Sequence, residues 1–296
     1  MNLPETLLLA FDDEAALAQR LAATLGCAFA VIARHRFPDG ETRLRLPPTL
    51  PAHVVLLRGL QDPNAKLTEL LLAAAGAREL GATRITLISP YLAYMRQDIE
   101  FNPGEVVSQR QLGRLLAGAF EAVITVDPHL HRVATMDEVL PGRRGLALSA
   151  APLLGAHVAR QVPGALLLAP DEEAGQWVRA AALAQGLDHA VCRKLRHGDH
   201  AVNVALPSTD VRGRAVVLLD DVASTGRTLA AAARGAVAAG AATVDVAVTH
   251  ALFVGDALAQ VHQAGVRHVW SSDCVPHASN VVSVVPLFVD ALRGSR

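Results

Sequence analysis

The amino-acid sequence predicts an α/β protein of two tandem domains, each a mostly parallel sheet flanked by helices. Short apolar segments alternate with Ala/Leu-rich segments of helical length along almost the whole chain. A segment of the first half, which begins at Val54, also has an echo, meaning a second segment with the same order of residue types, which begins at Val216. Strands that alternate with helices of about 10–15 residues are typical of βαβ units, whose parallel strands are covered on both faces.

Each expected element follows from the local pattern of apolar residues. Strands are expected where four to six mainly apolar residues stand together, at Thr6–Ala10, Val54–Leu57, Arg84–Ile88, Ala122–Val126, Leu166–Ala169, Val216–Leu219, Val244–Thr249 and His268–Ser271. Helices are expected over the longer Ala- and Leu-rich stretches, at Glu14–Leu25, Leu67–Leu80, Val107–Phe120, Trp177–Gln185, Thr228–Ala239 and Ala257–Ala264.

The echo suggests that one α/β domain occurs twice. In both copies an apolar strand leads through a loop into an Ala-rich helix, a Gly-Ala pair and another strand. We place the junction near residues 141–148, where Pro, Gly and Arg cluster, and expect domains at 1–145 and 146–296. The alternative is that any two βαβ units look alike. The first copy has Arg58-Gly59 after its strand, whereas the second has paired aspartates and a Ser/Thr/Gly loop, so only the second is equipped for a sugar phosphate.

Composition excludes several classes of protein. A formal net charge of −1 gives no long-range field for gripping nucleic acid, and 51% hydrophobic residues suit buried cores. No apolar run approaches the roughly 20 residues needed to cross a bilayer, and the first residues do not read as a signal peptide. The three cysteines, Cys27, Cys192 and Cys274, form no CxxC pair. We therefore expect a cytoplasmic protein with neither nucleic acid nor membrane as a partner.

The segment from Val216 to Thr228 is the strongest motif. An apolar strand delivers Asp220 and Asp221 to its carboxyl end, where ligands bind in parallel sheets. Gly226 permits a tight turn, so that backbone N–H groups and the start of the next helix form a phosphate cradle, with hydroxyls from Ser224, Thr225 and Thr228. The two carboxylates suit ribose hydroxyls or a bridging Mg²⁺. The alternative is a strand-to-helix turn with N-capping Asp and Thr residues.

This segment resembles the PRPP-binding signature shared by type I phosphoribosyltransferases and synthases of PRPP (5-phosphoribosyl 1-diphosphate). The resemblance implies two tandem type I phosphoribosyltransferase-like domains. It also implies that ribose 5-phosphate is bound by the residues of the loop, which are Asp220, Asp221, Ser224, Thr225, Gly226, Arg227 and Thr228.

Two segments of the first half separate a synthase from a transferase. Residues 36–41, Arg-Phe-Pro-Asp-Gly-Glu, taken alone predict a β-hairpin turn. They resemble the Phe-x-Asp-Gly-Glu motif of ribose-phosphate pyrophosphokinases, which implies that Phe37, Asp39 and Glu41 contact ATP from a neighbouring subunit of a homo-oligomer. Residues 89–98 resemble the family's Pro-Tyr-x-x-Tyr-x-Arg-Gln-Asp segment, which implies that Arg96 and Gln97 bind ATP, although alone they fit a surface loop.

The remaining motifs follow the ends of further strands. The sequence Asp127-Pro-His129-Leu-His131 reads alone as a surface loop or a transition-metal site. It resembles the family's Asp-x-His motif, which implies that His129 helps to position Mg·ATP, and His131 is additional. Asp171 matches a Pro-Asp motif of the cation and diphosphate site. The family usually continues with glycines, where this chain has Glu172–Gln176.

Lys194 and Arg196 match a Lys-x-Arg segment. They are two residues apart and would share one face of a strand. The resemblance implies catalytic residues that close over the phosphates of ATP, where cations stabilise the transferring group. Without the neighbouring motifs, Lys194 and Arg196 would be interpreted as part of a solvated basic turn.

The motifs occur in the family's order from about Arg36 to about Asp273. They predict an enzyme that transfers the diphosphate of ATP to the 1-hydroxyl of ribose 5-phosphate, with Mg²⁺ as cofactor and a homo-oligomeric state. Two alternatives remain open. One is a phosphoribosyltransferase that uses PRPP and a base, and the other is a catalytically silent, regulatory relative, which only the altered residues 172–176 favour.

Overall fold

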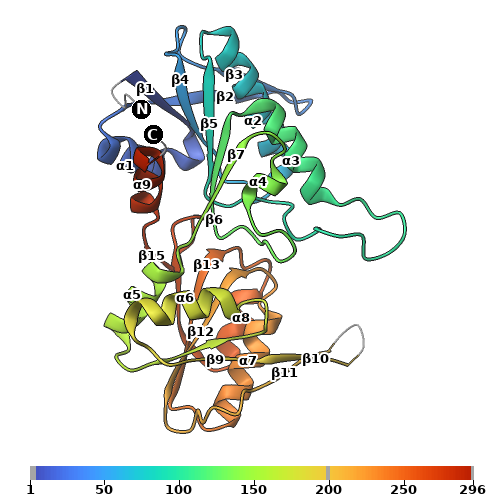
Figure 1. Ribbon diagram of the computed structural model, residues 1–296, viewed down its shortest axis with the longest axis vertical. Coiled ribbons are helices and arrows are strands. Elements are labelled where there is room, and N and C mark those ends of the chain that lie inside the picture. The colour runs from blue at the N-terminus through green and yellow to red at the C-terminus, as the bar shows by residue number, and fades with distance from the viewer. Residues whose placement is uncertain (1–4, 198–200, 295–296) are drawn as a thin grey trace. The chain divides into compact units, whose positions relative to one another are not determined.

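The computed structural model describes residues 5–197 and 201–294, with side chains outside 194–204. The chain forms two compact units (Figure 1). The first comprises the residues up to Leu148 together with those from Val285 onward, and the second comprises Ser149–Val284. Each unit contains one main sheet with helices on both faces, so the predicted fold class is confirmed.

The first unit is built on a seven-stranded sheet in the order β3-β2-β1-β4-β5-β6-β7. Only β3 is antiparallel, and the other neighbours pair in parallel. The strands are β1 Thr6–Phe11, β2 Ala28–Arg36, β3 Thr42–Arg45, β4 His53–Leu57, β5 Arg84–Ser89, β6 Ala122–Val126 and β7 Arg144–Leu148. Its helices are the 3-10 turn η2 Asp12–Glu14, α1 Ala15–Leu25, α2 Pro63–Glu79, α3 Ser108–Ala119, α4 Met136–Val139 and α9 Val285–Gly294.

The second unit has a six-stranded parallel sheet in the order β15-β14-β13-β12-β8-β9, and a hairpin β10-β11. The strands are β8 Leu166–Ala169, β9 His189–Val191, β10 Arg193–His197, β11 Ala201–Ala205, β12 Ala215–Ala223, β13 Thr243–Ala251, β14 Val266–Ser272 and β15 Asn280–Val282. The helices are α5 Ala151–Gln161, α6 Gly175–Gln185, α7 Arg227–Ala238 and α8 Ala257–Gln263.

The two sheets share one topology. Read from one edge, β2-β1-β4-β5-β6-β7 of the first unit corresponds to β9-β8-β12-β13-β14-β15 of the second. In the second unit, α5 and α6 cover one face and α7 and α8 the other, because alternate residues of the strands join separate apolar clusters. In the first unit α2 and α3 pack on the face that includes Leu9 and Leu56. Helix α1 lies against β1 and β2 and is joined by α9.

The boundary between the units differs from the expected one. We expected residues 141–148 to link the domains, but Arg144–Leu148 forms β7, which hydrogen bonds along β6 and completes the first sheet. We also expected 146–296 to form one domain. Helix α9 instead groups with the first unit, because Phe288, Val289 and Leu292 are buried and the helix packs against α1. The guanidinium of Arg293 donates to the carbonyl of Thr24 at 3.1 Å.

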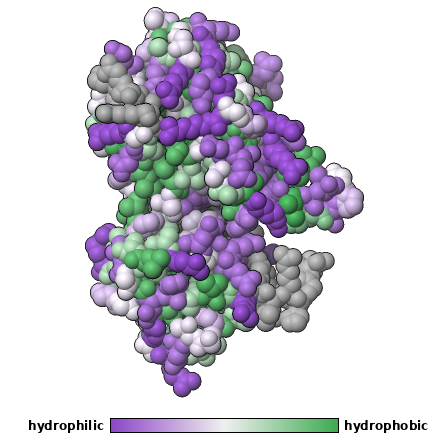
Figure 2. All heavy atoms as spheres, viewed as in Figure 1, coloured by the Kyte–Doolittle hydropathy of each residue, from purple (hydrophilic) through white to green (hydrophobic). Residues whose placement is uncertain are grey.

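Most of the surface in the space-filling view belongs to hydrophilic residues, with apolar residues scattered among them (Figure 2). Among residues 5–197 and 201–294, no helix combines the length and the apolar character that crossing a membrane requires.

Replacement of Phe288 by Ala tests the place of α9. The buried ring should cost about 3–5 kcal/mol of unfolding free energy when it is removed. Hydrogen exchange should accelerate in α1, which packs against α9, more than in α6 of the second unit. The matched control is Leu183→Ala, whose side chain is exposed and should matter little. Loss of protection in α6 with α1 unchanged would contradict this assignment.

Candidate functional site

The predicted phosphate loop joins β12 to α7 in the second unit. Gly226 is the N-cap of α7 and has φ +68°, in the left-handed region that favours glycine. A Cβ atom there would lie 3.1 Å from the carbonyl oxygen of Ala257 and 3.1 Å from Val261 Cγ2. The position therefore requires glycine for its backbone and for its packing, and the helix begins close against α8.

The backbone of residues 252–254 supports this loop from one side. The carbonyl of Ala223 accepts hydrogen bonds from the N–H groups of Leu252 and Phe253, at 3.0 and 2.9 Å. The carbonyl of Ser224 accepts one from Val254 at 3.0 Å. Because the first N–H groups of a helix have no intrahelical acceptor, the start of α7 has donors for an anion. Thr225 and Arg227 at this end are exposed.

Three aspartates gather at the carboxyl ends of β8 and β12. These strands pair in parallel, with Leu218 opposite Leu168. Their carboxyl ends therefore lie side by side, and these ends carry Asp220 and Asp221 on β12 and Asp171 just after β8. Asp171 and Asp221 are buried. Burial raises the pKa of Asp220 well above its ordinary value, and the negative charges of Asp221 and Asp171 raise it further. A divalent cation would relieve this repulsion, and carboxylate oxygens are the ligands that Mg²⁺ prefers.

The altered segment Glu172–Gln176 turns its two extra carboxylates outward. Glu172 and Glu173 are exposed, whereas Ala174 between them and α6 is fully buried. The turn is closed by the N–H of Ala174, which donates to Asp171 Oδ1 at 3.2 Å, and by the N–H of Gly175, which donates to the carbonyl of Glu172. The departure from the family's glycines thus adds no carboxylate to the interior of this unit.

The thiol of Cys192 lies near this cluster but is not reactive. It is fully buried, and burial together with the charge of Asp171 raises its pKa to about 12. Nucleophilic chemistry needs the thiolate, so Cys192 fills space beside the aspartates.

In the first unit, residues 37–41 form the turn of the β2-β3 hairpin. The N–H of Phe37 donates to the carbonyl of Glu41 at 2.8 Å, and that of Gly40 to the carbonyl of Phe37 at 3.0 Å. Asp39 Oδ1 accepts from the N–H of Glu41 at 3.1 Å, so this carboxylate shapes the turn. The ring of Phe37 stays 36% exposed, with His35 at its edge and the Arg43 guanidinium 5.9 Å from its centroid.

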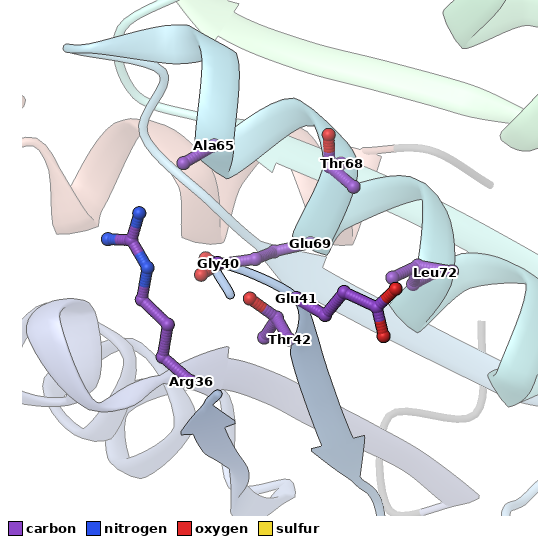
Figure 3. A pocket seen from close by; sticks show the side chains of 8 residues that line it. All are labelled: Arg36, Gly40, Glu41, Thr42, Ala65, Thr68, Glu69 and Leu72. Atoms are coloured by element: carbon purple, nitrogen blue, oxygen red, sulfur yellow. The ribbon is translucent and has the colours of Figure 1, made fainter. Parts of the chain in front are cut away.

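A cavity of about 350 Å³ lies between this turn and α2 (Figure 3). Its volume falls at the lower end of the range for small-molecule sites. Strand β2 contributes Arg36, the turn Gly40 and Glu41, and β3 Thr42, whereas α2 contributes Ala65, Thr68, Glu69 and Leu72. Of the three ATP contacts predicted on the turn, only Glu41 lines this cavity.

The second predicted ATP segment is held by Glu105. Its carboxylate accepts from the Gln97 amide at 3.0 Å, the N–H of Phe101 at 3.0 Å and the Asn102 amide at 2.6 Å. These bonds, that of Asn102 foremost, lower the pKa of Glu105. The Gln97 amide also donates to the carbonyl of Ile99 at 3.1 Å, so both of its N–H groups are used and its oxygen is the atom left for a ligand. Arg96 is exposed.

His129 and His131 lie side by side after β6, with Nε2 atoms 2.8 Å apart. Both side chains are half-buried. The structure thus brings the additional histidine to the predicted cation-binding one. Asp171, the other predicted metal contact, belongs to the second unit.

Lys194 and Arg196 lie on β10, which pairs antiparallel with β11. The backbone therefore forms the expected hairpin, and the two residues share one face of the strand. Their side chains lie outside the part of the chain whose side chains the structure describes.

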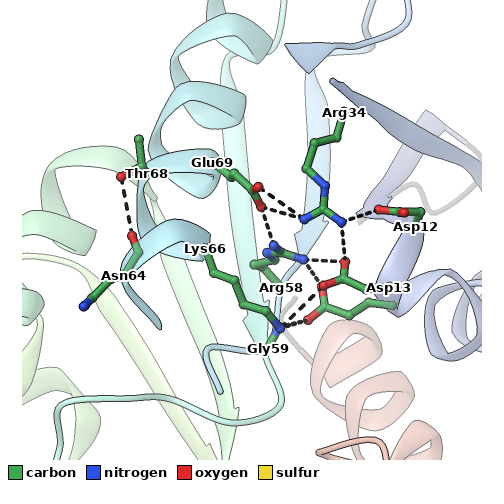
Figure 4. A network of polar contacts seen from close by, with 10 residues as sticks. Asp12, Asp13, Arg34, Arg58, Gly59, Asn64, Lys66, Thr68 and Glu69 are labelled. Carbon is green, nitrogen blue, oxygen red and sulfur yellow. Dashed lines mark hydrogen bonds and ion pairs between the residues drawn. The ribbon is translucent and has the colours of Figure 1, made fainter. Parts of the chain in front are cut away.

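In the first unit, a network of ion pairs lies at the place equivalent to the predicted phosphate loop (Figure 4). It was not predicted from the sequence. Arg58, which the echo aligns with Asp220, is fully buried at the end of β4. Its guanidinium pairs with Asp13 at 2.6 Å, Glu14 at 3.3 Å and Glu69, and lies 4.2 Å from the centroid of the Phe11 ring. The network also includes Asp12, Arg34 and Lys66.

This network contains one more carboxyl than cations. Four acids, Asp12, Asp13, Glu14 and Glu69, surround three bases, Arg34, Arg58 and Lys66. Burial raises the pKa of Glu14 to about 7 and outweighs the attraction of Arg58 and Lys66. Glu14 Oε1 accepts from the N–H of Gly59 at 2.6 Å. The first unit therefore pairs the buried Arg58 with its own acids at the place where the second unit has the predicted phosphate loop.

The two sheets and the loop of the second unit define a tandem pair of phosphoribosyltransferase-like domains. Residues 6–119 match the model of the N-terminal domain of ribose phosphate pyrophosphokinase, and residues 167–286 match that of the phosphoribosyl transferase domain. The chain is 35% identical to a ribose-phosphate pyrophosphokinase of Methanopyrus kandleri, with 97% of this chain and 98% of the relative covered. It is 32% identical to one of Methanosarcina acetivorans, with 94% and 95% covered.

This chain belongs to the ribose-phosphate pyrophosphokinase family, as the sequence motifs predicted. Its fold is similar to the crystal structure of phosphoribosylpyrophosphate synthetase from Mycobacterium smegmatis, with a TM-score of 0.82, 24% identity and 98% of both chains covered.

Gly226→Ala should weaken binding of the predicted ligand ribose 5-phosphate by about 10-fold or more, because displacement of the loop would cost at least one charge-assisted hydrogen bond, worth about 1.5–3 kcal/mol. The matched control is Gly213→Ala in the same unit, where φ is +69° but a Cβ would meet no atom within 4 Å. Both variants carry the same backbone strain, so titration calorimetry on both isolates the effect of the close contact with α8. Equal losses of affinity would contradict this role for Gly226.

Glu14 should make the stability of the protein depend on pH. Its folded pKa of about 7 lies above the ordinary 4.5, so the stability it contributes is full below pH 4.5 and is lost as pH rises through 7. The difference in unfolding free energy between wild type and Glu14→Gln should therefore fall with rising pH, by at most about 1.4 kcal/mol per pKa unit. Denaturant unfolding at several pH values measures it. The exposed Glu79→Gln is the control, and a difference independent of pH would be inconsistent with a buried, titrating Glu14.

Proposed function

We propose that this protein is an enzyme that transfers the β,γ-diphosphate of ATP to the 1-hydroxyl of ribose 5-phosphate, giving PRPP and AMP. The observation that carries the proposal is the loop from Asp220 to Thr228, supported in the required geometry by Gly226 and residues 252–254, in a chain that matches curated ribose-phosphate pyrophosphokinases over nearly its whole length.

The loop of the second unit would bind ribose 5-phosphate. The N–H groups at the start of α7 and the hydroxyls of Ser224, Thr225 and Thr228 would hold the 5-phosphate. Asp220 and Asp221 would accept hydrogen bonds from ribose hydroxyls and orient the sugar, and Gly226 and Arg227 complete the loop. The 1-hydroxyl oxygen then forms a bond to the β-phosphorus of ATP, the bond from that phosphorus to the α-phosphate oxygen breaks, and the hydroxyl proton is released. Positioning and charge stabilisation supply most of the rate.

The family's divalent cation would be Mg²⁺ in this enzyme. We propose that Asp171 and His129 hold it. The raised pKa of Asp220 indicates a negative potential at the carboxyl ends of β8 and β12, where a cation would be favourable. Bound Mg²⁺ would neutralise charge on the phosphates of ATP.

ATP itself would be contacted by residues of the first unit and closed over by the hairpin of the second. Phe37 has an exposed ring face for the base, Glu41 lines a cavity, and Arg96 is exposed for a phosphate. Asp39 and Gln97 are engaged within their own loops, so we assign them to shaping the ATP site as well as to contacting it. Lys194 and Arg196 would stabilise the transferring diphosphate.

The setting we propose is a cytoplasmic homo-oligomer. The cysteines Cys27, Cys192 and Cys274 are free, which suits a reducing compartment. Contribution of Phe37–Glu41 to the ATP site of a neighbouring subunit would make the oligomer necessary for activity.

The deciding experiment is to incubate the purified protein with ATP, Mg²⁺ and ribose 5-phosphate and to follow AMP and PRPP by anion-exchange chromatography. AMP should form in step with PRPP. Lys194→Ala should lower kcat by about 100-fold or more, as loss of one stabilising donor does. The control is Arg193→Ala, on the opposite face of β10, which should keep its activity.

No AMP from the folded protein would overturn the proposal. PRPP-dependent transfer to a base would then support a phosphoribosyltransferase, and the lack of both activities would support a silent, regulatory relative.

A further inference from the structure

The imidazoles of His129 and His131 converge on a single point of the first unit. Their Nε2 atoms are 2.8 Å apart, and the ring planes stand at 90° with centroids 3.9 Å apart. At that distance one ring can donate a hydrogen bond to the other, and both rings are close enough to become ligands of one cation. The protein can satisfy that arrangement with one shared proton or with one cation bound to both nitrogens.

The backbone holds the pair in place from both ends. Asp127 has φ +37° and its N–H donates to the carbonyl of Leu148 at 2.8 Å, which ties the start of the loop to β7. The N–H of Leu130 donates to the carbonyl of Pro128 at 2.6 Å, so His129 lies at the centre of a three-residue γ-turn.

After the pair, Arg132 is fixed by the buried Asp98 at 2.6 Å and by the ring of Phe101 at 5.7 Å from its centroid. Both fixed points lie in the first unit. The two imidazoles are therefore preorganised by contacts that involve no ligand.

The spacing matches a chelate of a transition-metal dication. Such ions lie about 2.0–2.1 Å from an imidazole nitrogen, so two ligands at a right angle, as in octahedral coordination, place their nitrogens about 2.9 Å apart, and two at a tetrahedral angle place them about 3.3 Å apart. The observed 2.8 Å is within about 0.1 Å of the first separation and about 0.5 Å short of the second. A cation could therefore enter once both rings turn their Nε2 lone pairs towards it.

Two imidazoles also change which cation the site prefers. Mg²⁺ takes oxygen ligands and keeps several of its waters, whereas imidazole suits Zn²⁺, Co²⁺ and Ni²⁺. A site with His129 alone would contribute one nitrogen among oxygens, and the second nitrogen favours a softer ion. We propose that His131 makes a bis-imidazole chelate with His129, which binds transition-metal dications such as Zn²⁺ and Co²⁺ more tightly than Mg²⁺.

The consequence for catalysis rests on the proposed function. If His129 helps to position the metal complex of ATP, His131 is the residue that determines which metal that complex contains. Water and phosphate oxygens would complete the coordination shell. The binding itself requires no substrate and can be measured without any turnover.

The test is calorimetric titration of untagged, metal-stripped, full-length protein with Zn²⁺ and with Co²⁺, in the absence of nucleotide and sugar. Wild type should bind either ion at this site more tightly than Mg²⁺. His131→Asn should weaken the affinity at least ~10-fold, and His129→Asn by a similar factor. The matched control is His189→Asn, exposed on β9 of the second unit, which should bind as wild type does.

X-ray absorption spectroscopy of the wild-type Zn²⁺ complex supplies a readout that does not depend on how a variant folds. Two imidazole ligands would support the chelate, and one or none would overturn it. Equal affinity in wild type and His131→Asn, or an equal loss in His189→Asn, would also overturn it.

The chromatographic assay for AMP and PRPP keeps this inference separate from the proposed function. If the protein forms PRPP but His131→Asn leaves its Zn²⁺ affinity unchanged, the chelate is refuted and the proposed function stands. If the Zn²⁺ affinity depends on His131 but the protein forms no PRPP, the chelate stands and the proposed function is refuted.

Discussion

A buried guanidinium is the constraint around which the first unit is organised. Arg58 directly follows β4, whose last four residues are apolar, and its side chain has no exposed surface. A charge in that position is tolerated only when several partners surround it. The partners come from two separate elements, Asp13 and Glu14 from η2 and Glu69 from α2, so the end of β4 fixes where both of them lie. The ring of Phe11 covers the guanidinium face. Removal of Arg58 would leave four carboxyls with only two bases, Arg34 and Lys66.

The second unit has a carboxyl at the same position, beside two others. Asp220 occupies the place of Arg58, and Asp221 and Asp171 add to its negative potential, which the raised pKa of Asp220 reflects. One topology thus carries a buried guanidinium surrounded by acids in one unit and three neighbouring carboxyls in the other. Carboxyls gathered at the carboxyl ends of parallel strands are a feature of ligand sites, whereas an arginine paired with acids of its own unit is a feature of structural cores. The difference accords with our proposal that the second unit binds the sugar phosphate.

Sequence patterns predicted the interior strands and the tight turn at Gly226 well, because both depend on local features. Strands β6 and β8 have the bounds expected from their apolar runs, and Gly226 adopts the positive φ that its loop implied. Strand β2, next to the edge strand β3, is only partly buried, and β9 and β15 have three residues each, so their apolar signal is weak. The Arg58 cluster was missed because its acids are far away in sequence, although an Arg directly after an apolar strand was a usable signal. The convergence of His129 and His131 depends on a γ-turn that residue types do not specify.

The helix after the last strand of each sheet belongs to the other unit: α5 follows β7 but packs with α6, and α9 follows β15 but packs with α1. This exchange sets the order of events during synthesis. While the ribosome is still translating the second unit, the first already has its whole sheet but lacks the helix that covers α1. Its apolar face stays open until α9 emerges from the exit tunnel. The half of the chain that is made first is therefore the half that is finished last, and a nascent chain stalled before Val285 would present that face to chaperones.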